Sequence, residues 1–281
     1  MSGSIDYTVL FPAGSSSQSN GLLNALYGGG VSTSGAASLQ ALRTAETNET
    51  SQVTMTAKQP AVARDIAAFK TAVASAKTPA ALLQNPTALK VLMAANGMSD
   101  QTAYTAMAQR VLLSNIHDTK SLVNKMAASD ARWKTVTQTY DFANKGLSVL
   151  KTPKVLSSLA NGYAEVTWRQ SLDATTPGLS NALSFRAQAS TVTSVDQILG
   201  DPVLRDVITT ALNIPRQIAF QSIPTQEKAI SNRLDLAKLK DKHFVDTLSQ
   251  EYLLNKASAG STGMGSASPE QLASRAAGLL V

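Results

Sequence analysis

Cysteine is absent from this chain of 281 residues, which excludes disulfide bonds and thiolate metal sites. Histidine is scarce: His117 and His243 lie far apart in the sequence. A zinc site needs several such ligands close together. We therefore expect neither a bound metal nor a cofactor, and we interpret both histidines as surface residues at helix starts.

Long apolar runs are also missing, since none approaches the roughly 20 residues that cross a bilayer as a helix. The first residues, MSGSIDYTVLFPAGSSS, lack the basic segment of a secretory signal. We expect no membrane span, and a chain that is either cytoplasmic or exported by a route that does not use that signal.

Aromatic and charged residues are few, at 5% and 16% of the chain. Alanine, serine, threonine, glutamine and asparagine take their place, which favours helices packed through small side chains over a β-rich core. The net charge is +6, but lysine and arginine are scattered singly, without the clustering or motif of a nucleic-acid-binding protein. The composition therefore predicts an all-α protein that does not bind nucleic acid.

Apolar residues recur with the period of a helix along most of the chain. A clear example is a stripe formed by Val62, Ile66, Phe69 and Val73. Many segments begin with a capping residue followed by proline, a signature of a helix start. We predict an irregular multi-helix bundle with proline-initiated helical repeats.

Composition divides the chain into four parts. Residues 1–35 are rich in glycine and serine with a single charge, which predicts a flexible tail and a possible export signal. We expect a helical core over 36–256, a flexible linker over 257–268 and an amphipathic helix over 269–281.

One stretch occurs twice, 116 positions apart: LLQNPTALKVLMAANGM at 82–98 and ILGDPVLRDVITTALNI at 198–214. Both place Asn or Asp before proline, and then an apolar helix. The similarity suggests an internal duplication of 82–142 and 198–254, although any proline-initiated helix in an alanine-rich chain looks similar. The prolines at 86, 153 and 202 are unevenly spaced, which argues against a regular solenoid.

No pattern of catalytic residues is evident. The carboxylates at Asp130, Asp141, Glu165, Asp173 and Glu227 are isolated in sequence. Trp133 and Trp168 each follow helical spacing beside an arginine. We interpret them as core anchors whose neighbours, Arg132 and Arg169, extend to solvent, in preference to a stacking platform for bases.

Three stretches resemble a known family: YAEVTWRQSLDATTPGL (163–179), SVDQILGDPVLRDVITTALNIPRQIAFQSIPTQEKAISNRLD (194–235) and FVDTLSQEYLL (244–254). It is an alphaproteobacterial family of unknown function, domain of unknown function twelve-seventeen, whose genes are commonly found in flagellar clusters. The resemblance extends from about 40 to 256. It implies a bacterial host and a role associated with the flagellum, and it carries over no catalytic residue.

The resemblance and the composition together favour a non-enzymatic structural or assembly protein of the flagellum. It would be exported by the type III route and would pack by helices against itself or other flagellar proteins. The alternatives are a cytoplasmic export chaperone or regulator and, less favoured, an enzyme. The residues expected to contact partners are Leu39, Leu42, Val53, Leu272, Ala276 and Leu279. Packing inside the chain is the competing interpretation for all six.

Overall fold

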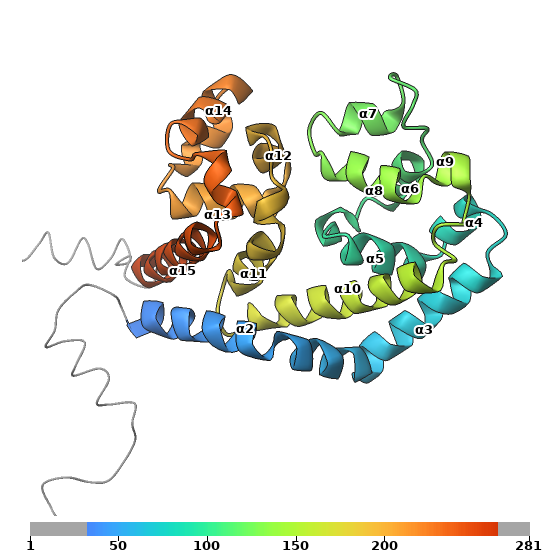
Figure 1. Ribbon diagram of the computed structural model, residues 1–281, viewed down its shortest axis with the longest axis horizontal. Helices are drawn as coiled ribbons and strands as arrows, with labels where there is room; N and C mark the ends of the chain where they lie inside the picture. The colour runs from blue at the N-terminus through green and yellow to red at the C-terminus, as the bar shows by residue number, and fades with distance from the viewer. Residues whose placement is uncertain (1–32, 264–281) are drawn as a thin grey trace, which may run out of the picture.

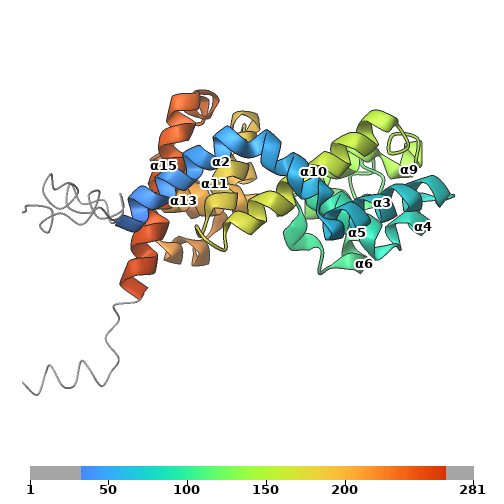
Figure 2. The same cartoon turned by 90° about the horizontal axis from the view of Figure 1, so that it is seen from below.

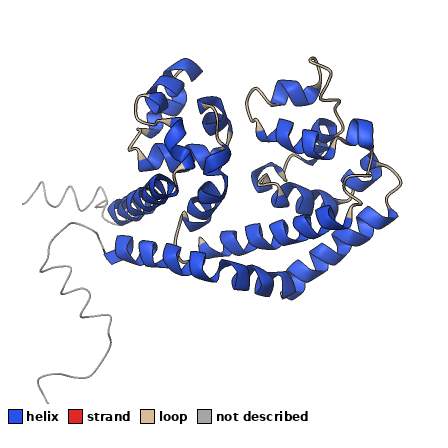
Figure 3. Ribbon diagram, viewed as in Figure 1, coloured by secondary structure: helices blue, strands red, loops and turns tan. Residues whose placement is uncertain are grey.

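The computed structural model describes residues 33–263, and within this range every regular element is helical, as Figure 3 shows. The prediction of an all-α protein is confirmed. The helices form two lobes that stand side by side on a pair of long helices (Figure 1). These long helices are α2 (Thr33–Lys58) and α10 (Pro153–Leu172).

The first lobe holds a core that is buried by short helices. They are α3 (Pro60–Ser75), α4 (Pro79–Leu83), α5 (Pro86–Ala95), the 3-10 helix η2 (Ser99–Gln101), α6 (Thr105–Leu112), α7 (Leu122–Met126), α8 (Arg132–Tyr140) and α9 (Phe142–Lys145). Trp133 is the largest fully buried side chain of this core. Its burial confirms the interpretation of this tryptophan as an anchor.

The second lobe has a separate core. It is built from α11 (Leu179–Gln188), η3 (Ala189–Thr191), α12 (Val195–Gly200), α13 (Pro202–Ala211), η4 (Arg216–Phe220), α14 (Ile223–Ser231), η5 (Leu236–Lys240) and α15 (Lys242–Gly263). Both long helices contribute side chains to both cores. On α10, Leu159 and Tyr163 belong to the first core, whereas Trp168 belongs to the second. The two lobes are therefore joined by continuous helices and not by a loose linker.

The repeated sequence folds twice into the same unit, once in each lobe. The Asn85 side chain caps α5 and the Asp201 side chain caps α13, in each case just before a proline in the first turn. One helix earlier, the Thr78 side chain caps α4 and the Ser194 side chain caps α12. The capping box predicted for Ser194 is present.

The ends of the two units also correspond. Gly97 has φ +71° and its counterpart Asn213 has φ +51°, so each places a left-handed residue after its helix. The next backbone N–H then closes the helix: Met98 donates to the Met93 carbonyl oxygen at 2.9 Å, and Ile214 donates to that of Thr209 at 2.8 Å. Asparagine tolerates this conformation better than most residues, so the second unit ends without a glycine.

The correspondence continues into helices where the sequences look unrelated. With the same separation of 116 positions, α3 matches α11, and Phe69 and Phe185 are both fully buried. In each lobe a tyrosine hydroxyl from a long helix donates to an aspartate of this unit. Tyr163 donates to Asp65 at 2.6 Å, and Tyr252 donates to Asp206 at 2.7 Å. The repeat is thus a three-helix unit fastened to a long helix by a tyrosine.

Two expected boundaries change. Helix α2 begins at Thr33, so the last three residues of the predicted tail are helical. Helix α15 runs to Gly263, so residues 257–263 continue a helix where a linker was predicted. The helix expected to open at Asp118 begins instead at Leu122. The residues before it form a polar turn, in which the Asn115 and Asp118 side chains accept from the backbone N–H groups two positions later and the Asn124 amide donates to the Asp118 carbonyl oxygen. The predicted helix 269–281 lies outside the described residues.

Candidate functional site

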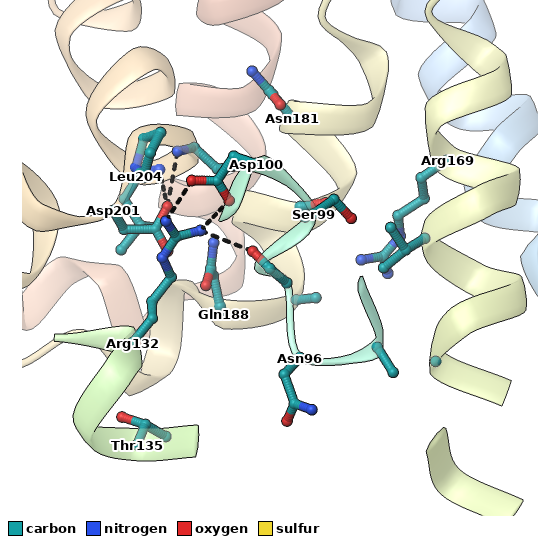
Figure 4. A pocket seen from close by; sticks show the side chains of 18 of the residues that line it. Asn96, Ser99, Asp100, Arg132, Thr135, Arg169, Asn181, Gln188, Asp201 and Leu204 are labelled. Carbon is teal, nitrogen blue, oxygen red and sulfur yellow. Dashed lines mark hydrogen bonds and ion pairs between the residues drawn. The ribbon is translucent and has the colours of Figure 1, made fainter. Parts of the chain in front are cut away.

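A cleft of about 660 Å³ lies between the two lobes. Its floor is the middle of α10. One wall comes from the end of α5, η2 and the start of α8, and the other from α11, α12 and the start of α13. The side-chain caps that start α5, α12 and α13 therefore also help to position the walls of the cleft. Figure 4 shows the side chains that face this space.

Arg132, at the first turn of α8, closes one end of the cleft. Its Nε and Nη2 donate to the Asp130 carboxylate, and its Nη1 and Nη2 donate to that of Asp100, at 2.8 to 3.2 Å. Nη1 also donates to the Gly97 carbonyl oxygen at 2.8 Å. Across the cleft, Asp201 of the second lobe lies 3.9 Å from Nε. All of the guanidinium nitrogens are occupied, so Arg132 holds the site together and has no free donor for a ligand.

The electrostatics follow from this packing. Burial by itself would lower the pKa of the Arg132 guanidinium, but the bonds to Asp130 and Asp100 outweigh it and raise that pKa above its ordinary value. Burial would likewise raise the pKa of Asp100, and Arg132 reverses this, so the pKa lies below its usual range. For Asp201, which is 5% exposed, burial prevails and the pKa is raised.

The lobes touch directly beside this ion-pair cluster. A Cβ atom on Gly200 would lie 3.0 Å from the Ser129 carbonyl oxygen and 3.2 Å from the Asp130 Cα. Glycine therefore lets the end of α12 approach the backbone of the loop before α8 closely, and a larger residue would push the two apart.

Arg169 lies on the floor of the cleft and is 9% exposed. Its Nη2 donates to Glu49 of α2 at 2.8 Å and also pairs with Glu165, one turn earlier on α10. Its Nε is buried without a hydrogen-bond partner among the described residues, and so is the Ser99 hydroxyl oxygen on the facing wall. The Nε of Arg169 is therefore an unused donor that the surrounding side chains cover.

The predicted partner-contact residues lie elsewhere. Leu42 is 2% exposed in the second core, and Val53 packs against both cores. Leu39 is half-buried on α2. Packing inside the chain, the competing interpretation, therefore describes Leu42, whereas partner contact at Leu39 and the partly buried Val53 stays a prediction. Leu272, Ala276 and Leu279 lie outside the described residues.

Sequence reasoning missed the cleft residues because it treated each charge separately. Trp168 is buried as expected, but Arg132 and Arg169 do not extend to solvent: both are ion-paired inside the cleft. Asp130 and Glu165 were expected to be isolated and are their partners. An arginine beside a buried tryptophan was the available signal, since such a guanidinium needs a carboxylate nearby.

Two further properties constrain the chemistry. Between residues 33 and 263, no group of three or more histidine, aspartate or glutamate side chains is placed to hold a metal ion. In the same range, no helix combines the length and the apolar character that crossing a membrane requires.

Comparisons with known proteins agree with this architecture. A family described as "protein of unknown function (DUF1217)" matches residues 95–245, a range that contains every residue lining the cleft. A solved crystal structure, of protein AGR_C_984 from Agrobacterium tumefaciens, is similar with a TM-score of 0.68 and 23% identity. The similarity covers 81% of this chain and 96% of that one, and it concerns the fold alone. No curated protein matches the sequence.

Proposed function

This chain belongs to the DUF1217 family, and we propose that it is a non-enzymatic structural or assembly protein of the bacterial flagellum. In this proposal it leaves the cell by the flagellar type III route and packs by its helices against itself or against axial subunits. The flagellar context comes from the resemblance carried by residues 163–254.

The observation that carries the assembly role is the placement of the two terminal helices. Helix α2 packs against α15 as well as against α10. In Figures 1 and 2 the start of α2 and the end of α15 lie at the same end of the molecule. The start of α2 and the end of α15 can therefore contribute to one surface for a partner.

A reporter fusion tests the export step. Residues 1–35 are fused to a reporter enzyme and expressed in motile cells and in cells that lack the flagellar export ATPase. We expect the reporter in the medium of the motile cells only. Retention inside both strains would refute export.

A second candidate, a cytoplasmic chaperone or regulator of flagellar subunits, is favoured by one observation, the cleft between the lobes. A cleft with unused donors suits a segment of another protein. Under this candidate the full chain would co-purify with unexported subunits and would be absent from sheared flagella.

A further inference from the structure

The cleft combines two properties that its role in joining the lobes does not explain. The first is a set of unused hydrogen-bonding groups. The Nε of Arg169 and the hydroxyl oxygen of Ser99 are buried without partners. Figure 4 shows these two side chains on opposite sides of the same space. A buried donor without an acceptor costs free energy, which is recovered only if the side chain turns toward an acceptor in the cleft.

More unused groups line the same space. The amides of Gln170 on α10 and Gln188 on α11, and the hydroxyl of Ser184, make no side-chain hydrogen bond to any other described residue. An amide both donates and accepts, as a peptide group does. Amides facing a cleft from two helices therefore suit an extended polypeptide backbone, which offers a carbonyl oxygen and an N–H at every residue.

The second property is a surplus of negative charge. Arg132 and Arg169 are the basic residues that line the cleft, and they pair with five carboxylates, of which Asp100, Asp201 and Glu165 line the cleft as well. The whole chain carries +6, so this site has the opposite sign to the rest of the protein. Such a site repels an anion and attracts a cation.

We propose that the cleft binds an extended, polar polypeptide segment that carries lysine or arginine side chains. The glutamine amides of the cleft walls bond to the carbonyl oxygens and N–H groups of neighbouring peptide units. A basic side chain lies against Glu165, whose side chain is 37% exposed and so can receive it. The volume of about 660 Å³ is within the usual range for ligand sites.

The probe is the acetylated and amidated peptide Ser-Thr-Lys-Thr-Gln-Lys-Thr-Ser, titrated calorimetrically into the full-length protein at low salt. The matched peptide has glutamate in place of both lysines. We expect the lysine peptide to bind at least about tenfold more tightly, and to weaken as salt rises. Failure of the lysine peptide to bind, or equal affinity of the two peptides, would overturn the proposal.

Substitutions locate the binding. We expect Glu165→Gln and Gln188→Ala each to weaken the lysine peptide about five- to tenfold. The controls are Glu251→Gln and Gln138→Ala, which are exposed and outside the cleft, and these should leave affinity unchanged. Equal effects of the cleft and control substitutions would place binding elsewhere and refute the site.

A polyamine distinguishes the contribution of positive charge to binding from that of hydrogen bonds to the peptide backbone. Spermidine carries the positive charge without a peptide backbone. We expect it to compete with the lysine peptide only at concentrations at least about tenfold higher. Competition at equal concentration would refute the backbone contacts. All of these measurements use purified protein, so failure of the export experiment would not affect them.

Discussion

Replacing Arg132 with methionine tests directly whether this arginine stabilises the contact between the lobes. Methionine keeps much of the length of the side chain but removes every donor. Asp130 and Asp201, whose side chains are 12% and 7% exposed, would lose their only nearby cation among the described residues. Asp100 would also lose its partner, but its side chain is 38% exposed and solvent compensates it.

Removing one partner of a buried ion pair typically costs about 3–5 kcal/mol, because the remaining charge is left uncompensated. We expect R132M to lower the free energy of unfolding by about this amount. For a chain of this size that corresponds to a fall in Tm of roughly 6–20 °C. The control is Lys134→Met on the same helix, since Lys134 is exposed and makes no ion pair within residues 33–263, and it should change stability by less than about 0.5 kcal/mol.

The pH dependence gives the prediction a second, independent test. In the native protein the Asp100 pKa is lowered, so its contribution is present above the unfolded pKa and is lost as pH falls through the folded value. In R132M, Asp100 and Asp201 lack the cation, and burial raises their pKa values instead. As pH falls from 7 toward 5, protonation of these carboxylates removes their uncompensated charge in R132M. The difference in free energy of unfolding between R132M and the native protein should therefore shrink. Urea unfolding at both pH values measures it. A loss below about 1 kcal/mol, or a gap that widens on acidification, would refute the assigned role of Arg132.

The remaining predictions concern the repeat and the contact between the lobes, and all are measured by urea unfolding. Gly97→Ala should cost about 1–2 kcal/mol because its φ is +71°, whereas Asn213→Gly at the matching position should be neutral or stabilising; equal costs would contradict the correspondence. Gly200→Ala should cost about 1–3 kcal/mol through its contact with Ser129, and a neutral result would show that the lobes are not in contact there. Tyr252→Phe should cost about 1.5–3 kcal/mol, because it removes a hydrogen bond to a carboxylate; no loss would contradict its role in fastening the repeat.

Local signals in the sequence determined much of the fold. A capping residue before proline accepts from the backbone N–H groups two or three positions later, so the start of α5 at Asn85 and of α13 at Asp201 could be predicted from adjacent residues. The left-handed residue after α5 was also predictable, because glycine at 97 is the usual choice there.

The cleft was not predictable because its interactions are non-local. Arg132 pairs with residues 32 positions before it and 69 positions after it, and Arg169 pairs with Glu49, 120 positions away. These pairs depend on how separate helices, and for Asp201 the two lobes, pack together, and no local spacing encodes this. The ion pairs of the two repeat units could not be matched from the sequence for a different reason. Lys90 and Asp206 occupy matching positions, but their charges are opposite.

The central proposal, a role in assembly of the flagellum, is tested most directly by locating the full-length chain. Flagella are sheared and purified from motile cells and from cells that lack the export ATPase, and the chain is quantified in each fraction with an antibody. The proposal predicts the chain in the flagellar fraction of motile cells and its retention inside the export-deficient cells. A chain that stays inside both kinds of cell would contradict it.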